Sequence, residues 1–261
     1  MERRNFLAGT LAASALTVAQ GAGAQTQDQP SKQREYYQIR RYFMQSGPQT
    51  SMTEKYISEA LIPALAGKGG PVGAFRLDIG PETPTFYVLI PVSSPAAAAS
   101  LELDLNQNET YVKAAEPFWS APASSPAFVR VDSSLLIAFE GWPKITPPEK
   151  GKRIFQLRTY ESPSYRDHVR KVEMFHSGEF DFFKNAGFHQ VFFGDTVIGP
   201  RMPNLTYMLS FGDSAELEAK WKVFANDPAW KKLSSDPKYA FESIVSNITN
   251  LILSPLSASQ I

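Results

Sequence analysis

The chain has 261 residues, with 26 basic and 26 acidic side chains, so its formal net charge is zero. A neutral chain has no overall field that attracts nucleic acid or an anionic membrane surface, and we therefore expect no nucleic-acid partner. Cysteine is absent, which excludes disulfides, thiolate nucleophiles, iron–sulfur clusters and cysteine zinc sites. The length allows one or two domains, and the hydrophobic fraction of 43% is sufficient for a buried core.

The first 24 residues have the pattern of an export signal. Residues 3–7 read Arg-Arg-Asn-Phe-Leu, a short alanine-rich apolar run follows, and small residues end at Ala24. This start resembles the twin-arginine signal of bacteria, with an ordinary secretory signal as the alternative. The apolar run is too short for stable membrane insertion. We therefore expect cleavage near Ala24 and a periplasmic protein in which residues 25–34 form a flexible leader.

A short strand pattern with a polar face occurs twice. Residues 154–160 alternate with period two, and the same Gln-x-Arg-x-Tyr spacing occurs once before, within residues 37–42. The repeat predicts that each stretch is the first strand of one copy of a duplicated fold. The side chains that share the polar face are Gln38, Arg40, Tyr42, Gln156, Arg158 and Tyr160.

The first copy, residues 35–140, predicts the order βαββαβ. Its helices are expected from Ser51, with a kink at Pro63, and from Ser94 to Trp119. The expected strands are 36–43, 72–79, 85–90 and 134–139.

The second copy, residues 153–256, repeats this order after a linker rich in proline and lysine at 141–152. Its helices are expected over 164–185 and from Ser214, where Asp213 can cap the first turn. The expected strands are 154–160, 190–198, 205–211 and 247–253.

Further landmarks align between the two copies. Ile79-Gly80-Pro81 corresponds to Ile198-Gly199-Pro200, and Tyr87 is matched with Tyr207. If helices cover one face of each sheet, the other two faces can meet. The prediction is an α+β fold in which two tandem ferredoxin-like βαββαβ units form a pseudo-two-fold dimeric α+β barrel.

The second copy resembles the NIPSNAP family of the dimeric α+β barrel superfamily. The resemblance depends on residues 155–160, the turn at 198–200 and Ala-Asn-Asp-Pro-Ala-Trp at 225–230, and it covers residues 153–256 well and 35–140 more weakly. Animal members are mitochondrial proteins of vesicle handling and mitophagy signalling, and the superfamily includes cofactor-free monooxygenases, isomerases and haem-handling proteins. The resemblance therefore implies a fold without choosing an activity.

The polar face of the two first strands is the candidate ligand site. If Ile39, Phe155 and Leu157 pack on helices, the six polar residues named above point into the cavity between the sheets. Arginines in such a cavity need an anion, which predicts an anionic or aromatic small molecule. The alternative is that Arg40 and Arg158 pair with internal acids and fasten the two halves.

The three histidines, His168, His176 and His189, all lie in the second copy. Glu173-x-x-His176 is half of a carboxylate-bridged metal motif whose second half is missing, so we predict no metal and no cofactor, with haem as a remote possibility. His189, Tyr160 and Tyr207 are the candidates for proton chemistry in a cofactor-independent monooxygenase or isomerase.

The sequence thus predicts a periplasmic NIPSNAP-like protein, monomer or homodimer, that binds a small molecule between its halves. The alternatives are an enzyme that uses the same cavity, and a structural or interaction protein with a filled barrel.

Overall fold

The computed structural model describes residues 33–45 and 47–261. The predicted signal peptide, residues 1–24, and most of the predicted leader lie outside the described residues. Of the leader, Arg34 donates from Nη1 to the backbone oxygen of Ala138 at 3.3 Å. Within the described ranges no helix has the length and apolar character needed to cross a membrane.

The first half follows the predicted order of elements, and its caps explain where the later helices begin. Ser94 accepts a hydrogen bond from the amide of Ala97 at the start of one helix, and Asn108 caps the next. A π-helical turn precedes Pro63, which lacks the N–H that a regular helix requires there. The elements are β1 (Tyr36–Phe43), α1 (Pro48–Tyr56), η1 (Ile57–Leu61), α2 (Ile62–Leu65), β2 (Gly73–Ile79), β3 (Thr85–Val92), α3 (Pro95–Asn106), α4 (Glu109–Trp119) and β4 (Arg130–Ala138).

The second half repeats the order, including a π-helical turn in its first helical segment. The predicted cap at Asp213 is present, because its side chain accepts from the amide of Glu216. Asp227 caps the following helix, and Trp230 packs on Phe224 with ring centroids 4.6 Å apart. The elements are β5 (Ile154–Glu161), α5 (Tyr165–Met174), η2 (Phe175–Glu179), α6 (Phe180–Asn185), β6 (His189–Ile198), β7 (Asn204–Phe211), α7 (Ser214–Asn226), α8 (Pro228–Ser234), η3 (Pro237–Tyr239), α9 (Phe241–Ile244) and β8 (Asn247–Pro255).

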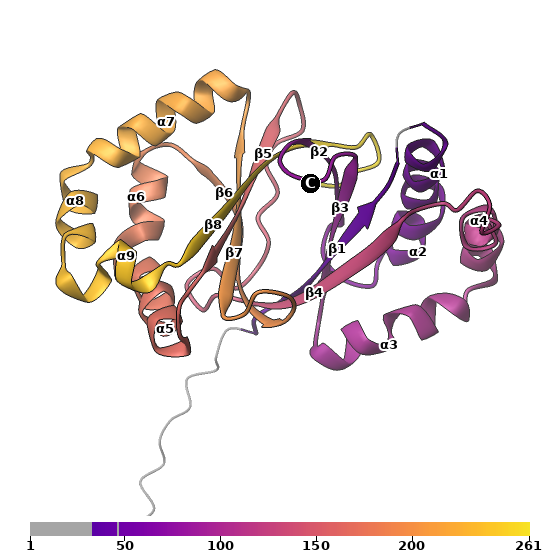
Figure 1. Ribbon diagram of the computed structural model, residues 1–261, viewed down its shortest axis with the longest axis horizontal. Coiled ribbons are helices and arrows are strands. Elements are labelled where there is room, and N and C mark those ends of the chain that lie inside the picture. The colour runs from indigo at the N-terminus through magenta and orange to yellow at the C-terminus, as the bar shows by residue number, and fades with distance from the viewer. Residues whose placement is uncertain (1–32, 46) are drawn as a thin grey trace, which may run out of the picture. The chain divides into compact units, whose positions relative to one another are not determined.

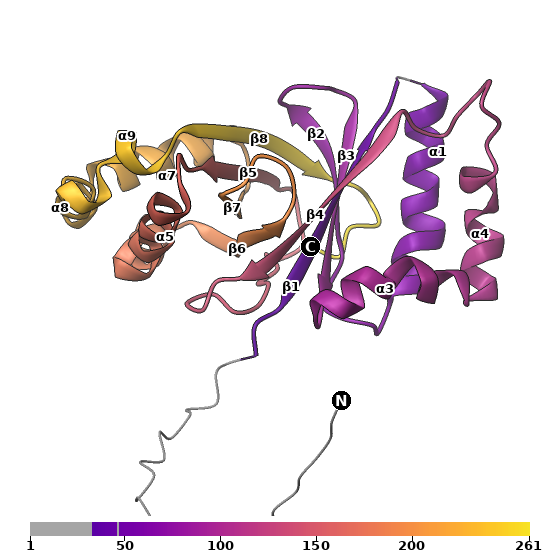
Figure 2. The same ribbon diagram turned by 60° about the horizontal axis from the view of Figure 1, so that its bottom comes forward.

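The eight strands close into one antiparallel barrel in the order β1-β3-β2-β8-β5-β7-β6-β4. The first half contributes β4-β1-β3-β2 and the second contributes β8-β5-β7-β6, joined through β2 with β8 and β4 with β6. Helices α1–α4 lie on one side of the strands and α5–α9 on the other (Figure 1), and the turned view shows the same division (Figure 2). The predicted α+β barrel is therefore confirmed.

The buried hydrophobic side chains form three clusters. One fills the interior of the barrel, and one lies in each of the two helix layers. The interior contains Tyr37, Ile39, Phe155 and Leu157. One helix layer contains Tyr42 with side chains of α1, α3 and α4, and the other contains Tyr160 and Tyr207 with side chains of α5 to α9. Both faces of the first strands are thus buried, each in a different layer.

The predicted direction of these faces was wrong. Ile39, Phe155 and Leu157 fill the barrel instead of packing on helices, and the polar residues of β1 and β5 lie under the helices. The physical reason is that the barrel interior is narrow and filled by apolar side chains, whereas arginine stems and tyrosine rings can pack beneath a helix and reach polar partners there.

The sequence match of Tyr87 with Tyr207 was also wrong by one residue. Tyr87 pairs with Arg41 across β1 and β3 and faces the barrel, whereas Tyr207 pairs with Arg158 and faces the helices. A shift of one residue reverses the face of a strand side chain. The residue of β3 that corresponds to Tyr207 is therefore Val88, opposite Arg40.

Candidate functional site

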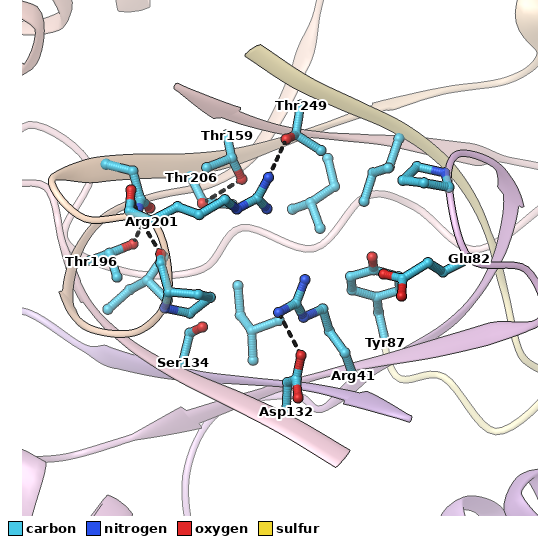
Figure 3. A pocket seen from close by; sticks show the side chains of 17 residues that line it. Arg41, Glu82, Tyr87, Asp132, Ser134, Thr159, Thr196, Arg201, Thr206 and Thr249 are labelled. Carbon is cyan, nitrogen blue, oxygen red and sulfur yellow. Dashed lines mark hydrogen bonds and ion pairs between the residues drawn. The ribbon is translucent and has the colours of Figure 1, made fainter. Parts of the chain in front are cut away.

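A cavity of about 290 Å³ opens at one end of the barrel, beside the turns that follow β2 and β6. Its floor is apolar and includes Ile39, Leu157 and Leu251. Its wall is polar and charged, with side chains from both halves (Figure 3). The charged and aromatic members of the wall are Arg41, Glu82, Tyr87, Asp132 and Arg201.

Arg41 belongs to a row of three residues across β4, β1 and β3. It lies opposite Asp132 on one neighbouring strand and opposite Tyr87 on the other. Its Nη2 donates to Oδ2 of Asp132 at 2.9 Å. Burial raises the pKa of Tyr87, although the nearby Arg41 guanidinium acts in the opposite direction. The Tyr87 hydroxyl therefore stays protonated beside the Arg41 guanidinium, which is fixed by its ion pair with Asp132.

Arg201 enters the cavity from the turn between β6 and β7. Its backbone is left-handed, with φ of 58°, and Glu82 in the corresponding β2–β3 turn has φ of 61°. The Nη1 of Arg201 lies 3.2 Å from Oε1 of Glu161 and donates to Oγ1 of Thr249 at 3.1 Å. In Figure 3 the guanidinium groups of Arg41 and Arg201 extend into the cavity from different sides.

Much of the remaining polar wall is hydrogen-bonded internally. The hydroxyls of Thr159 and Thr206 lie 2.8 Å apart, and Thr196 donates to Oδ1 of Asn204 at 2.7 Å. Internal pairing of these groups makes the two guanidinium groups the strongest remaining donors toward a ligand.

The predicted site residues of the first half do not line this cavity. Arg40 is 4% exposed, and its Nη1 lies 2.5 Å from Oε1 of Glu102 on α3. Its Nε and Nη2 donate to Oε1 of Gln38 at 3.1 and 2.9 Å. Tyr42 packs beside Tyr56 in the same layer, with ring centroids 6.2 Å apart. Arg40 thus pairs with a half-exposed carboxylate of its own half, so this pair does not fasten the two halves together as the alternative interpretation expected.

The equivalent residues of the second half also lie under helices, with different partners. Gln156 accepts a hydrogen bond from Nε1 of Trp221 at 2.7 Å, and the guanidinium of Arg158 lies 4.5 Å from the centroid of the Trp221 ring. The hydroxyls of Tyr160 and Tyr207 are 2.9 Å apart and buried. Neither tyrosine lines the cavity, so the predicted proton chemistry there lacks both of them.

The three histidines are separated from one another. His168 is buried, with Nε2 2.7 Å from Oδ1 of Asp195. His176 bonds to the backbone of Val172 and of Gly141. His189 lies at the start of β6, away from the cavity, and donates from Nε2 to the backbone oxygen of Thr146 at 3.0 Å. Over residues 33–45 and 47–261 no three acidic or histidine side chains cluster closely enough to hold a metal ion.

Sequence reasoning missed the charged residues of the cavity wall. The Gly-Pro landmarks mark the two turns, and the residue after each landmark is Glu82 or Arg201. Arg41 and Asp132 carried no repeated pattern, because position 159, which corresponds to Arg41, is a threonine. A pattern search for repeats therefore could not find them.

The closed barrel with helices outside it defines the class of protein as an α+β barrel. The structure is similar to a candidate monooxygenase from Lactobacillus acidophilus NCFM, with TM-score 0.58, 10% identity, and coverage of 87% of this chain and 97% of that one. A candidate monooxygenase from Fusobacterium nucleatum gives TM-score 0.57 and 11% identity over 87% and 94% of the two chains. An anthrone oxidase-like protein gives TM-score 0.51 and 7% identity, with coverage of 86% of this chain and 92% of that one. At these identities the similarity concerns the fold alone.

The particular family is identified from the second half of the chain. Residues 155–260 match the NIPSNAP family model. The resemblance predicted from the strand, the turn and the Asp-Pro-Ala-Trp helix start is thereby confirmed. None of the curated proteins compared with the sequence matches it.

Proposed function

We propose that the protein binds a small organic anion in the cavity at the end of the barrel, through Arg41 and Arg201. The observation that carries this proposal is the convergence of two guanidinium groups on one cavity with an apolar floor. Each group is held by a carboxylate, Asp132 for one and Glu161 for the other. An arginine has more N–H donors than these contacts use, so donors remain for a ligand.

The size and lining of the cavity narrow the class of ligand. A volume of about 290 Å³ is at the lower end of small-molecule sites. A guanidinium binds a planar carboxylate through parallel hydrogen bonds, and the floor of Ile39, Leu157 and Leu251 suits an apolar body. The ligand class is a small aromatic or branched carboxylic acid. The barrel interior itself is filled, and the cavity at its end is the space that supports ligand binding over a purely structural role.

The proposal includes a duplicated architecture in which residues 35–140 and 153–256 are tandem ferredoxin-like units joined by the linker 141–152. Each half contributes four strands in the same relative order, which supports this division. The two units then supply one arginine each to the shared site, and a single polypeptide completes it.

The test is calorimetric titration of the full chain with benzoate and with its uncharged analogue benzamide. Benzoate is expected to bind and benzamide to bind much more weakly, because only the carboxylate engages the guanidinium groups. Arg41→Gln and Arg201→Gln should each weaken benzoate binding about tenfold or more, since a hydrogen bond to a charged group contributes ~1.5–3 kcal/mol.

The matched control is Arg76→Gln. Like the two cavity arginines, Arg76 pairs with a carboxylate, that of Asp78 at 3.2 Å. It does not line the cavity. Benzoate affinity should be unchanged in this variant. Equal binding of benzoate to the unmodified chain and to both cavity variants would refute the proposal.

A second candidate function is a cofactor-independent monooxygenase or isomerase that uses the same cavity. The similarity of fold to candidate monooxygenases supports it, together with a protonated Tyr87 beside Arg41, a pair that could stabilise a phenolate or enolate oxygen. Oxygen uptake in the presence of a small quinol, lost in Tyr87→Phe, would favour this candidate. If benzoate binds but no quinol is turned over, the result supports binding without catalysis.

The proposed location is the periplasm, after export through the twin-arginine signal. The sequence of residues 3–7 supports this proposal, and these residues lie outside the described part of the chain. Changing Arg3 and Arg4 together to lysine should leave the protein in the cytoplasmic fraction of a bacterial host. Export that is unaffected by this change would favour the ordinary secretory signal instead.

A further inference from the structure

We infer that Arg158 is the anion contact of a second binding site, between β5 and α7, that takes a small monocarboxylate. This site lies in the helix layer of the NIPSNAP half, on the opposite face of the sheet from the barrel interior. It does not depend on the cavity at the end of the barrel.

The two halves differ at one corresponding helix position. Glu102 is eight residues after Ser94, the N-cap of α3, and Trp221 is eight residues after Asp213, the N-cap of α7. Glu102 provides the carboxylate 2.5 Å from Arg40. Trp221 instead places its ring 4.5 Å from the guanidinium of Arg158. The second half therefore has the arginine without an acid at this position.

The carboxylate whose charge acts on Arg158, that of Glu179, is already paired. Glu179 on η2 lies 2.8 Å from Nζ of Lys171 on α5, and both side chains are almost completely buried. Thr53 and Leu61 of the first half follow Gln38 at the same sequence spacings as Lys171 and Glu179 follow Gln156. Both are uncharged. The additional cation of the second layer, Lys171, is thus neutralised by its own acid, and Arg158 remains one positive charge in excess.

The other groups that face Arg158 are neutral. Tyr160 lies under its guanidinium, at 5.3 Å from the ring centroid, and Tyr207 is opposite it on β7. Burial raises the pKa of Tyr207 far above its ordinary value, so its hydroxyl cannot supply the missing negative charge. A partly buried cation without a counter-charge is unfavourable, and an external anion would relieve this.

Arg158 also has an unsatisfied donor. Its Nε is buried and has no hydrogen-bond partner, and among the described residues no carboxylate lies within ion-pair distance of its guanidinium. The side chain as a whole is only partly buried. The rings of Trp221 and Tyr160 flank the guanidinium, with centroids 4.5 and 5.3 Å from it. One excess charge flanked by aromatic rings suits a monovalent carboxylate with a planar body.

The experiment follows the arginine Nε–Hε signals of the ¹⁵N-labelled full chain by NMR during titration with sodium benzoate at constant ionic strength. The Arg158 signal is assigned from its loss in Arg158→Gln. We expect it to shift saturably with benzoate and not with benzamide. The same shift should persist in an Arg41→Gln/Arg201→Gln double variant, in which the barrel-end site is impaired.

Two variants exchange the charge pattern of the halves. Trp221→Glu supplies the acid that Arg40 has in the first half, and should weaken the benzoate response of the Arg158 signal at least tenfold. Glu102→Gln removes that acid from the first half, but Arg40 stays buried and bonded to Gln38, so the benzoate response of the Arg158 signal should be unchanged in this variant. The titration of the unmodified chain keeps the test decisive even if Trp221→Glu does not fold.

The inference is overturned if the Arg158 signal in the unmodified chain does not move with benzoate. It is equally overturned if benzamide moves the signal as far, or if the shift disappears in the double variant of the barrel-end cavity. In the last case benzoate would be acting only through the first site.

Discussion

The ammonium group of Lys171 lies 2.8 Å from Oε2 of Glu179, and only 1% and 3% of the two side chains are exposed. This pair is buried beneath the helices of the second half, beside the rings of Tyr160 and Phe175. The corresponding positions in the first half are Thr53 and Leu61, so the fold does not require the pair. Desolvation of two charges offsets most of their attraction, and the net stabilisation from such a pair is small.

The first prediction concerns this pair. Lys171→Met should lower the free energy of unfolding by about 3–5 kcal/mol, because it leaves the Glu179 carboxylate buried without its partner. The double variant Lys171→Met/Glu179→Leu should recover most of that loss. Urea unfolding measures both. As a control, Lys222→Met removes the exposed pair with Glu218 and should leave stability almost unchanged. A single variant as stable as the double variant would contradict the prediction.

The second prediction concerns the backbone of Arg201. At φ of 58°, a residue with a Cβ is less favourable than glycine by roughly 1 kcal/mol. Arg201→Ala should therefore be less stable than Arg201→Gly by about that amount. Both variants lose the side-chain contacts with Glu161 and Thr249, so their difference isolates the backbone. Thermal unfolding of the two proteins, with the same comparison at Glu82, would show whether the ordering is reversed.

The third prediction concerns the titration of tyrosine. Of the ten tyrosines, burial raises the pKa of Tyr37, Tyr42, Tyr56, Tyr87 and Tyr207. A raised folded-state pKa contributes stability that is fully present below the unfolded pKa of about 10 and is lost as the pH rises beyond it. Alkaline titration followed by tyrosinate absorbance should show these five ionising only with unfolding. Ionisation of the five near pH 10, with intact circular dichroism, would disprove the prediction.

The fourth prediction concerns Glu102 and Arg40. Glu102→Gln should destabilise the protein by about 1 kcal/mol, because the Arg40 guanidinium is buried and loses its only carboxylate among the described residues. Glu59→Gln, which removes an exposed pair with Lys55 on the same half, is the matched control and should have almost no effect. The measurement is the urea midpoint of each variant. Equal midpoints for the two variants would mean that water replaces the carboxylate at no cost.

The order of strands and helices was predictable from the sequence, because it depends on local signals. Alternation marked β1 and β5, the Gly-Pro turns marked the ends of β2 and β6, and Asp213 marked the start of α7. The second half also carried enough family-specific residues to identify a NIPSNAP domain. These features are set by neighbouring residues, so they can be predicted without knowledge of the packing.

The layer that each strand face meets was decided only by the tertiary structure. Alternation shows that Gln156, Arg158 and Tyr160 share a face, but it cannot say whether helices or a second sheet cover that face. Here both faces are buried, and the apolar one with Phe155 and Leu157 fills the barrel. The candidate cavity likewise depends on closure of the barrel, which brings Arg41 and Arg201 together across 160 residues of chain. Local sequence determined the elements, and the competition for space inside a closed barrel determined which side chains were left to meet a ligand.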